Sequence, residues 1–224
     1  MVSSHPKPRV AILISGRGSN MVALINAAKA EGFPAEIAVV ISNRADAGGG
    51  LASVAGVPTV TIESKPFGKD RAAFETVLQS TLEAHGIELI CLGGFMRLFT
   101  AEFVQRWYGK MLNIHPSLLP SFPGLDPHGQ ALQAGVKVSG ATVHFVTPET
   151  DAGPIVMQGV VEVRDGDTPA TLSERILTIE HRIFPQALRL LASGQLRLDG
   201  TICRFIGDAN AAGTLISPLP EREA

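Results

Sequence analysis

Cysteine is scarce in this sequence: only Cys91 and Cys203 occur among its 224 residues. Two cysteines are too few for a disulfide framework or for a four-ligand zinc site. The spacings of Cys with His, or of Glu with His, that are typical of metal ligands are also missing. Cys91 lies in an apolar run, which predicts a small buried side chain. We therefore expect no metal ion and a reducing, cytoplasmic environment.

Charged residues are few as well, at 18% of the chain, and the formal net charge is -2. This charge gives no broad cationic field for DNA or RNA, so we expect no nucleic-acid partner and only local groups that hold an anion. No run reaches the roughly 18 consecutive apolar residues of a membrane helix. The first apolar run, residues 10–14, is also too short for the core of a signal peptide. We expect a soluble protein without a membrane partner.

Apolar runs alternate with segments of helical spacing through the first half of the chain. The alternation is typical of βαβ units and predicts an α/β fold, with a mostly parallel twisted sheet and helices on both faces, as in Rossmann-like proteins. Ser19 or Asn20 is expected to cap the first helix. The expected strands are residues 10–14, 37–41, 59–62 and 89–92, and the expected helices begin near residues 20, 50 and 70 and end near residues 28, 55 and 85.

The second half predicts a different arrangement. Two β-branched runs separated by a short loop are expected to pair as antiparallel strands. We expect one domain over residues 1–205, with halves of about 8–108 and 109–205, and a loosely packed tail over residues 206–224. The expected elements are strands at 111–115, 140–146 and 155–163, a Pro-rich loop at 116–127, a short helix at 128–134, and a long helix from Thr168 or Ser173 to about Ala192.

A glycine-rich turn, residues 15–20, joins the first expected strand to the first helix. Glycines let the backbone approach an anion, and a helix N-terminus offers free N–H groups. The turn lacks the further glycine of the dinucleotide motif and the Gly-Lys-Ser/Thr of the P-loop. It fits a phosphate cradle without lysine, or a tight turn that holds no ligand.

Asn113 and His115 are the first candidates for catalysis. Residues two apart on a strand point to the same face, and Pro116 would end this strand at the carboxyl edge of the sheet, where ligands bind in open α/β folds. An amide beside an imidazole can stabilise a carbonyl oxygen as it becomes an oxyanion. The alternative is a strand end whose polar groups satisfy loop carbonyls.

His144 and Asp151 are the second pair of candidates. His144 faces away from its apolar neighbours and would look toward the same cleft as His115, and Asp151 lies in the following loop. A carboxylate near an imidazole raises the imidazole pKa and fixes its orientation. The alternative is that Asp151 is an ordinary turn residue in a Gly/Pro-rich loop.

Several stretches, in order across residues 9 to about 200, resemble the glycinamide ribonucleotide (GAR) transformylase family within the formyl-folate transferases. The most specific is Asn-Ile-His-Pro-Ser-Leu-Leu-Pro, followed by an Asp-x-Gly-Pro loop. The sequence departs from the family pattern at Asp126-Pro127-His128-Gly129, which affects the expected substrate wall. The matching stretches are residues 16–20, 94–99, 111–120, 122–125, 140–146, 151–155 and 180–181.

The resemblance implies transfer of a formyl group from 10-formyltetrahydrofolate, as co-substrate, to the amine of GAR in purine biosynthesis, by a monomer or homodimer. Protonated His115 and the Asn113 amide would stabilise the oxyanion, and Asp151 would keep His115 cationic and help move the amine proton. The implied catalytic residues are Asn113, His115 and Asp151, with His144 in support. The implied GAR phosphate and ribose residues are Gly18, Ser19, Asn20 and Glu180. The implied folate residues are Arg71, Met96, Arg97, Leu98, Phe99, Thr147, Pro148, Glu149, Thr150 and Asp151.

Other functions remain open. Methionyl-tRNA formyltransferases resemble this core but carry a C-terminal RNA-binding domain and a basic surface, and formyltetrahydrofolate hydrolases add an N-terminal regulatory domain; we expect neither domain here. A nucleotide-binding Rossmann-type module would explain the first strand, turn and helix. It would need an acidic residue at the end of the second strand, where residues 42–44 are Ser-Asn-Arg.

Overall fold

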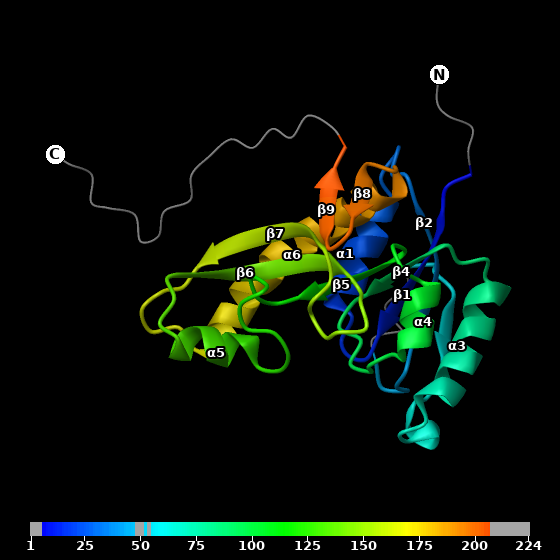
Figure 1. The fold of residues 1–224 in the computed structure, drawn as a ribbon, viewed down its shortest axis with the longest axis horizontal. Coiled ribbons are helices and arrows are strands. Elements are labelled where there is room, and N and C mark those ends of the chain that lie inside the picture. The colour runs from blue at the N-terminus through cyan, green and yellow to red at the C-terminus, as the bar shows by residue number, and fades with distance from the viewer. Residues whose placement is uncertain (1–5, 48–51, 53–54, 207–224) are drawn as a thin grey trace.

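The computed structural model describes residues 6–47, 52 and 55–206. Its main element is a seven-stranded sheet in the order β3-β2-β1-β4-β5-β6-β7 (Figure 1). The first five strands in this order pair in parallel. Strand β6 pairs antiparallel with both of its neighbours, β5 and β7. The strands are β1 (Arg9–Ile14), β2 (Glu36–Ser42), β3 (Thr59–Thr61), β4 (Leu89–Leu92), β5 (Met111–His115), β6 (Val138–Phe145) and β7 (Ile155–Glu162).

Helices cover both faces of this sheet, and a small hairpin follows the last helix (Figure 1). The helices are α1 (Ser19–Ala28), α3 (Arg71–Ala84), α4 (Ala101–Arg106), α5 (Pro127–Gln133) and α6 (Pro169–Ala192), with a 3-10 turn η1 (Lys65–Phe67). The hairpin strands are β8 (Leu196–Asp199) and β9 (Ile202–Phe205). Among the described residues, no helix is long and apolar enough to cross a bilayer.

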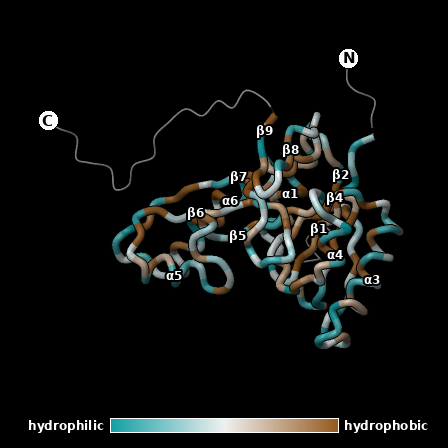
Figure 2. The backbone as a smooth tube through the Cα atoms, viewed as in Figure 1, coloured by the Kyte–Doolittle hydropathy of each residue, from teal (hydrophilic) through white to brown (hydrophobic). Residues whose placement is uncertain are grey.

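The sheet is buried on both sides because its inner strands are largely apolar: every residue of β4 is apolar, and every residue of β1 after Arg9. In β1, Val10 and Ile12 pack with α1 and α6, whereas Ala11 and Leu13 pack with α3 and α4. Such strands read as continuous hydrophobic runs, as expected for a parallel sheet between two helical layers. In Figure 2 the inner strands β1 and β4 are largely hydrophobic and the peripheral connections largely hydrophilic.

The helix starts show where sequence patterns succeed and fail. Asp70 caps α3 by accepting from the Ala73 N–H at 2.9 Å, and Thr168 begins α6 with a capping box. The prediction that Ser19 or Asn20 caps α1 is wrong: Gly18 precedes the helix with φ 77°, and no side-chain cap forms. The left-handed turn at Gly18 makes both residues part of the first helical turn instead.

The predicted α/β fold and antiparallel pair are confirmed. The sequence did not predict α4 or the β8–β9 hairpin, and β6 begins at Val138, earlier than expected. The helix expected at residues 50–55 lies mostly outside the described residues, as does all but Ile206 of the expected tail. The single-domain boundaries stay a prediction.

We expect Leu78→Ala to destabilise the protein by about 2–5 kcal/mol, because Leu78 is fully buried between α3 and the sheet. Val77→Ala is the matched control: Val77 is 42% exposed on the same helix, and its loss should change the unfolding free energy by less than about 0.5 kcal/mol. Urea unfolding of both variants measures this. Equal losses would contradict the placement of α3.

Candidate active site

Polar side chains gather at the carboxyl ends of the parallel strands. The turn after β1 and the segment after β4 are joined there, since the Ser15 N–H donates to the Gly94 carbonyl and the Ser15 hydroxyl accepts from the Met96 N–H at 2.8 Å. The adjacent strand β5 ends at His115. The edge therefore combines the glycine-rich turn, the 94–99 segment and the end of β5, as open α/β sheets do at ligand sites.

Asn113 and His144 face each other across β5 and β6. The His144 Nδ1 lies 2.9 Å from the Phe145 carbonyl oxygen, which can only accept, so Nδ1 carries the proton. The His144 Nε2 then accepts from the Asn113 amide at 3.1 Å. Burial lowers the pKa of His144, although the Phe145 carbonyl and Asp151 act in the opposite direction. His144 is thus a neutral imidazole that orients the Asn113 amide.

Asp151 lies between the two imidazoles. Its Oδ2 is 3.4 Å from His115 Nδ1, and its Oδ1 is 3.8 Å from His144 Nε2. The carboxylate is almost buried, with 10% of the side chain exposed, and its Oδ2 also accepts from the Gly124 N–H at 2.8 Å. The backbone of Asp151 has φ 54°, a left-handed conformation that aspartate tolerates better than most residues.

His115 has an oxygen acceptor at each ring nitrogen. Its Nδ1 faces Asp151, and its Nε2 donates to the Phe122 carbonyl at 3.0 Å. These two contacts hold the ring between the Asp151 carboxylate and the Phe122 carbonyl. Sequence reasoning missed the contacts from Phe122 and Gly124 because both are made by backbone groups, which no side-chain pattern reveals.

Asn20 and Glu180 form a second buried polar pair, from opposite ends of the chain. The Asn20 amide donates to Glu180 Oε2 at 2.6 Å, and the two residues are 8% and 6% exposed. Burial raises the pKa of Glu180, partly offset by the Asn20 hydrogen bond. The structure thus places Glu180 beside the first turn of α1, which begins at Ser19 directly after Gly18.

The residues expected to bind folate lie on three exposed segments. Met96 and Leu98 are 70% and 55% exposed, unusual for large apolar side chains. The Arg97 guanidinium lies 4.8 Å from the Phe74 ring centroid and donates to the Gly68 and Asp70 carbonyls, so the 94–99 segment is tied to the start of α3.

The other residues expected to bind folate are Arg71, Phe99 and those of the loop over residues 147–151. Arg71, the first residue of α3, is exposed beside that anchor. Phe99 is stacked between Phe95 and Phe103 at centroid distances of 5.3 and 4.7 Å. In the loop over residues 147–151, Thr147 donates to the Glu149 carbonyl, and Pro148, Glu149 and Thr150 are exposed.

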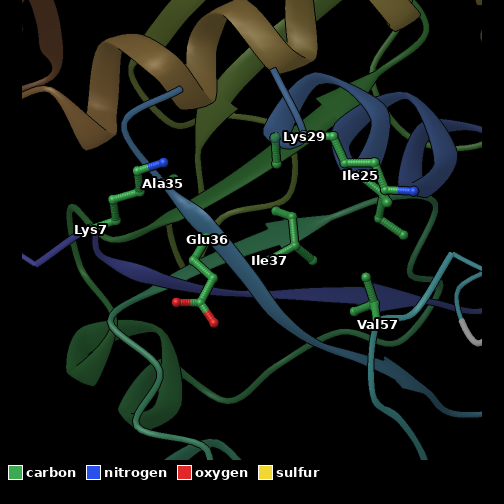
Figure 3. Close-up of a pocket in the computed structure, with 8 residues that line it drawn as sticks. Lys7, Ile25, Lys29, Ala35, Glu36, Ile37 and Val57 are labelled. Carbon is green, nitrogen blue, oxygen red and sulfur yellow. The ribbon is translucent and has the colours of Figure 1, made fainter. Parts of the chain in front are cut away.

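A surface hollow of about 320 Å³ lies elsewhere, between α1 and the beginning of β2 (Figure 3). The residues that line it include Lys7 and Glu36, at the amino ends of β1 and β2, and Lys29, at the end of α1. None of the predicted site residues lines it. The hollow is therefore separate from the carboxyl-edge cluster.

Residues 8–188 match the family described as formyl transferase. The chain belongs to this family. It is 40% identical over 190 residues to phosphoribosylglycinamide formyltransferase of Escherichia coli, covering 84% of this chain and 89% of that protein. A bovine trifunctional purine biosynthetic protein, adenosine-3, is 52% identical over 200 residues. The match covers 88% of this chain but only 20% of the bovine protein, so this chain corresponds to about a fifth of that relative's length.

Solved formyl transferase structures agree with this assignment. Glycinamide ribonucleotide transformylase 1 from Symbiobacterium toebii superposes with a TM-score of 0.86 at 45% identity, over 90% of this chain and 95% of that one. A formyltetrahydrofolate deformylase from Burkholderia mallei superposes with a TM-score of 0.81 at 29% identity, over 89% and 70%. The family predicted from the sequence motifs is confirmed.

We expect Glu180→Gln to stabilise this formyl transferase above pH 4.5. The folded-state pKa of Glu180 is raised above 4.5, so the carboxyl favours folding when protonated and loses that contribution as the pH rises through the folded pKa. The gain from glutamine should therefore be larger at pH 8 than at pH 4, as measured by chemical unfolding. Glu174→Gln, at an exposed position on the same helix, should show no such trend. A gain that is equal at both pH values would contradict the burial of a charge at Glu180.

Proposed function

We propose that this chain transfers the formyl group of 10-formyltetrahydrofolate to the amine of 5-phosphoribosylglycinamide in de novo purine biosynthesis. The observation that carries the proposal is the convergence of Asn113, His115 and Asp151 on one buried point at the carboxyl edge. The names and identities of its formyl transferase relatives support the same reaction.

The geometry supports a direct transfer. The amine attacks the formyl carbon, a C–N bond forms, and the bond from that carbon to the folate nitrogen breaks. The Asn113 amide has two N–H groups, and because His144 accepts one of them, the other is held for the oxygen that becomes negative. Protonated His115, held by the Phe122 carbonyl and Asp151, places positive charge beside the same oxygen.

Asp151 has two tasks in this proposal. Its carboxylate balances the charge of His115 at 3.4 Å. It also helps the proton of the attacking amine reach the departing folate nitrogen, through a water molecule. Because His144 is buried and its pKa is lowered, we assign it the orientation of Asn113 rather than proton transfer.

The substrates are assigned to the two sides of this cluster. Gly18, Ser19 and Asn20 hold the GAR phosphate with the free N–H groups of the α1 N-terminus, and Glu180 contacts the ribose or glycinamide end. The exposed apolar residues of the 96–99 segment and the 147–151 loop line the pterin site. Arg71 meets the glutamate carboxylate of the folate.

Hydrolysis of the formyl donor is the second candidate, because a deformylase shares the fold. Incubating the protein with a 10-formylated folate analogue, with and without GAR, separates the two. The transferase requires GAR for deformylation of the donor, and the hydrolase does not. We also propose that the protein is cytoplasmic, acts as a monomer or homodimer, and uses no metal or nucleic acid.

We expect Asn113→Ala to lower kcat at least about a hundredfold, because one oxyanion donor is typically worth about 2.7–4 kcal/mol of barrier. We expect a loss of at least about a hundredfold in Asp151→Asn as well, because a positioned proton-transfer group typically contributes about 10²- to 10⁴-fold. Steady-state assays with GAR and the folate analogue measure this. Asp199→Asn is the matched control, since Asp199 is exposed in β8 and pairs with Arg204. Near-normal turnover in either active-site variant would remove that residue from the mechanism.

A further inference from the structure

Residues 121–126 touch both ionisable catalytic side chains through backbone groups alone. The Phe122 carbonyl accepts from His115 at 3.0 Å, and the Gly124 N–H donates to Asp151 at 2.8 Å. The orientation of the two side chains therefore depends on the conformation of this segment.

Burial holds this conformation at one position, where Phe122 packs against the core. Only Phe122 is partly buried, and Leu125 is 78% exposed. Phe122 and Asp126 have φ values of 57° and 55°, a left-handed backbone that costs energy in residues with side chains. Polar contacts hold the rest of the segment: one lies at each end, and the Gln130 amide donates to the Leu125 carbonyl at 2.7 Å.

Each end has such a contact. At the amino end, the Ser117 hydroxyl donates to the Ser121 carbonyl at 2.6 Å. At the carboxyl end, Asp126 is the N-cap of α5, and its Oδ1 accepts from the Gly129 N–H at 3.1 Å. A negative side chain at a helix N-terminus is also favoured by the helix dipole. Asp126 thus connects the exposed segment to a helix that is anchored by its buried Pro127.

The cap needs a glycine as its partner. A Cβ at position 129 would lie 2.3 Å from Asp126 Oδ2 and 2.8 Å from its Cγ, so the carboxylate occupies the space of a side chain. Glycine inside a helix is less favourable than alanine, and here it permits this close contact. Both residues belong to the stretch 126–129, where the sequence departs from the family pattern.

We infer that Asp126 is a positioning residue for His115 and Asp151. By capping α5 against Gly129, it fixes the segment whose Phe122 carbonyl and Gly124 N–H orient the two catalytic side chains. It acts through the backbone and touches neither side chain. The inference rests on the proposed formyl transfer for its kinetic test, but not for its spectroscopic one.

The kinetic test compares four variants. Asp126→Ala should lower kcat about five- to tenfold with both KM values little changed, since losing a side-chain cap shifts a helix-end equilibrium by about 2- to 30-fold. Asp126→Asn keeps an acceptor and should restore kcat. Gly129→Ala should reproduce the loss by displacing the carboxylate. Thr168→Ala removes the cap of α6 instead and should leave kcat unchanged.

The spectroscopic test follows the imidazole nitrogen resonances of the uniformly labelled protein, with the His115 signals assigned from His115→Gln. They should shift in Asp126→Ala and Gly129→Ala, and not in Thr168→Ala. Unshifted His115 signals, wild-type kcat in either Asp126→Ala or Gly129→Ala, or no rescue by asparagine would each overturn the inference. A wild-type protein without transfer activity would overturn the proposed function instead, and the spectra would still decide the role of Asp126.

Discussion

The antiparallel pairing of β6 with β5 is the constraint on which the site depends. It sets Asn113 opposite His144 and His115 opposite Thr142. Because side chains alternate between the faces of a strand, a slip of one residue would put Ile114 or Val143 in the polar cluster instead. Both of these residues are buried in the core beneath α6, at 7% and 0% exposure. Hydrophobic packing therefore fixes the catalytic register, and the polar residues take the positions that this packing leaves.

The shared carboxylate then makes the two histidines different. A buried charge without a partner costs several kcal/mol, so Asp151 needs a cation or donors around it. His144 does not supply the cation, because its Nε2 accepts from the Asn113 amide and burial lowers its pKa. His115 faces the carboxylate with its Nδ1 at 3.4 Å and donates to the Phe122 carbonyl through its Nε2. His144 therefore orients the Asn113 amide, whereas His115 lies beside the carboxylate, although both imidazoles contact Asp151.

The sequence patterns that predicted correctly were those that burial enforces. Strand β1 could be read from five apolar residues because both faces of the sheet are covered, and Asn113 and His115 could be placed on one face because strand geometry has a period of two. The six-residue helix α4 was missed because it is short, although Thr100 caps it locally by accepting from the Phe103 N–H at 3.2 Å. The β8–β9 hairpin was missed as well, since its strands are only four residues long.

The fold alone does not choose between an amine and water as the acceptor, because a deformylase shares it. On the proposed assignment, the choice depends on Glu180. Its ionised carboxylate is disfavoured by burial, and the Asn20 amide is the donor that partly offsets this cost. An acceptor that carries an amine or hydroxyl donors to this carboxylate relieves the remaining cost when it binds, whereas a water molecule at the formyl carbon contributes nothing there. Transfer is then favoured because the amine acceptor gains binding energy at Asn20 and Glu180. These residues are separate from the oxyanion donors, which both reactions need.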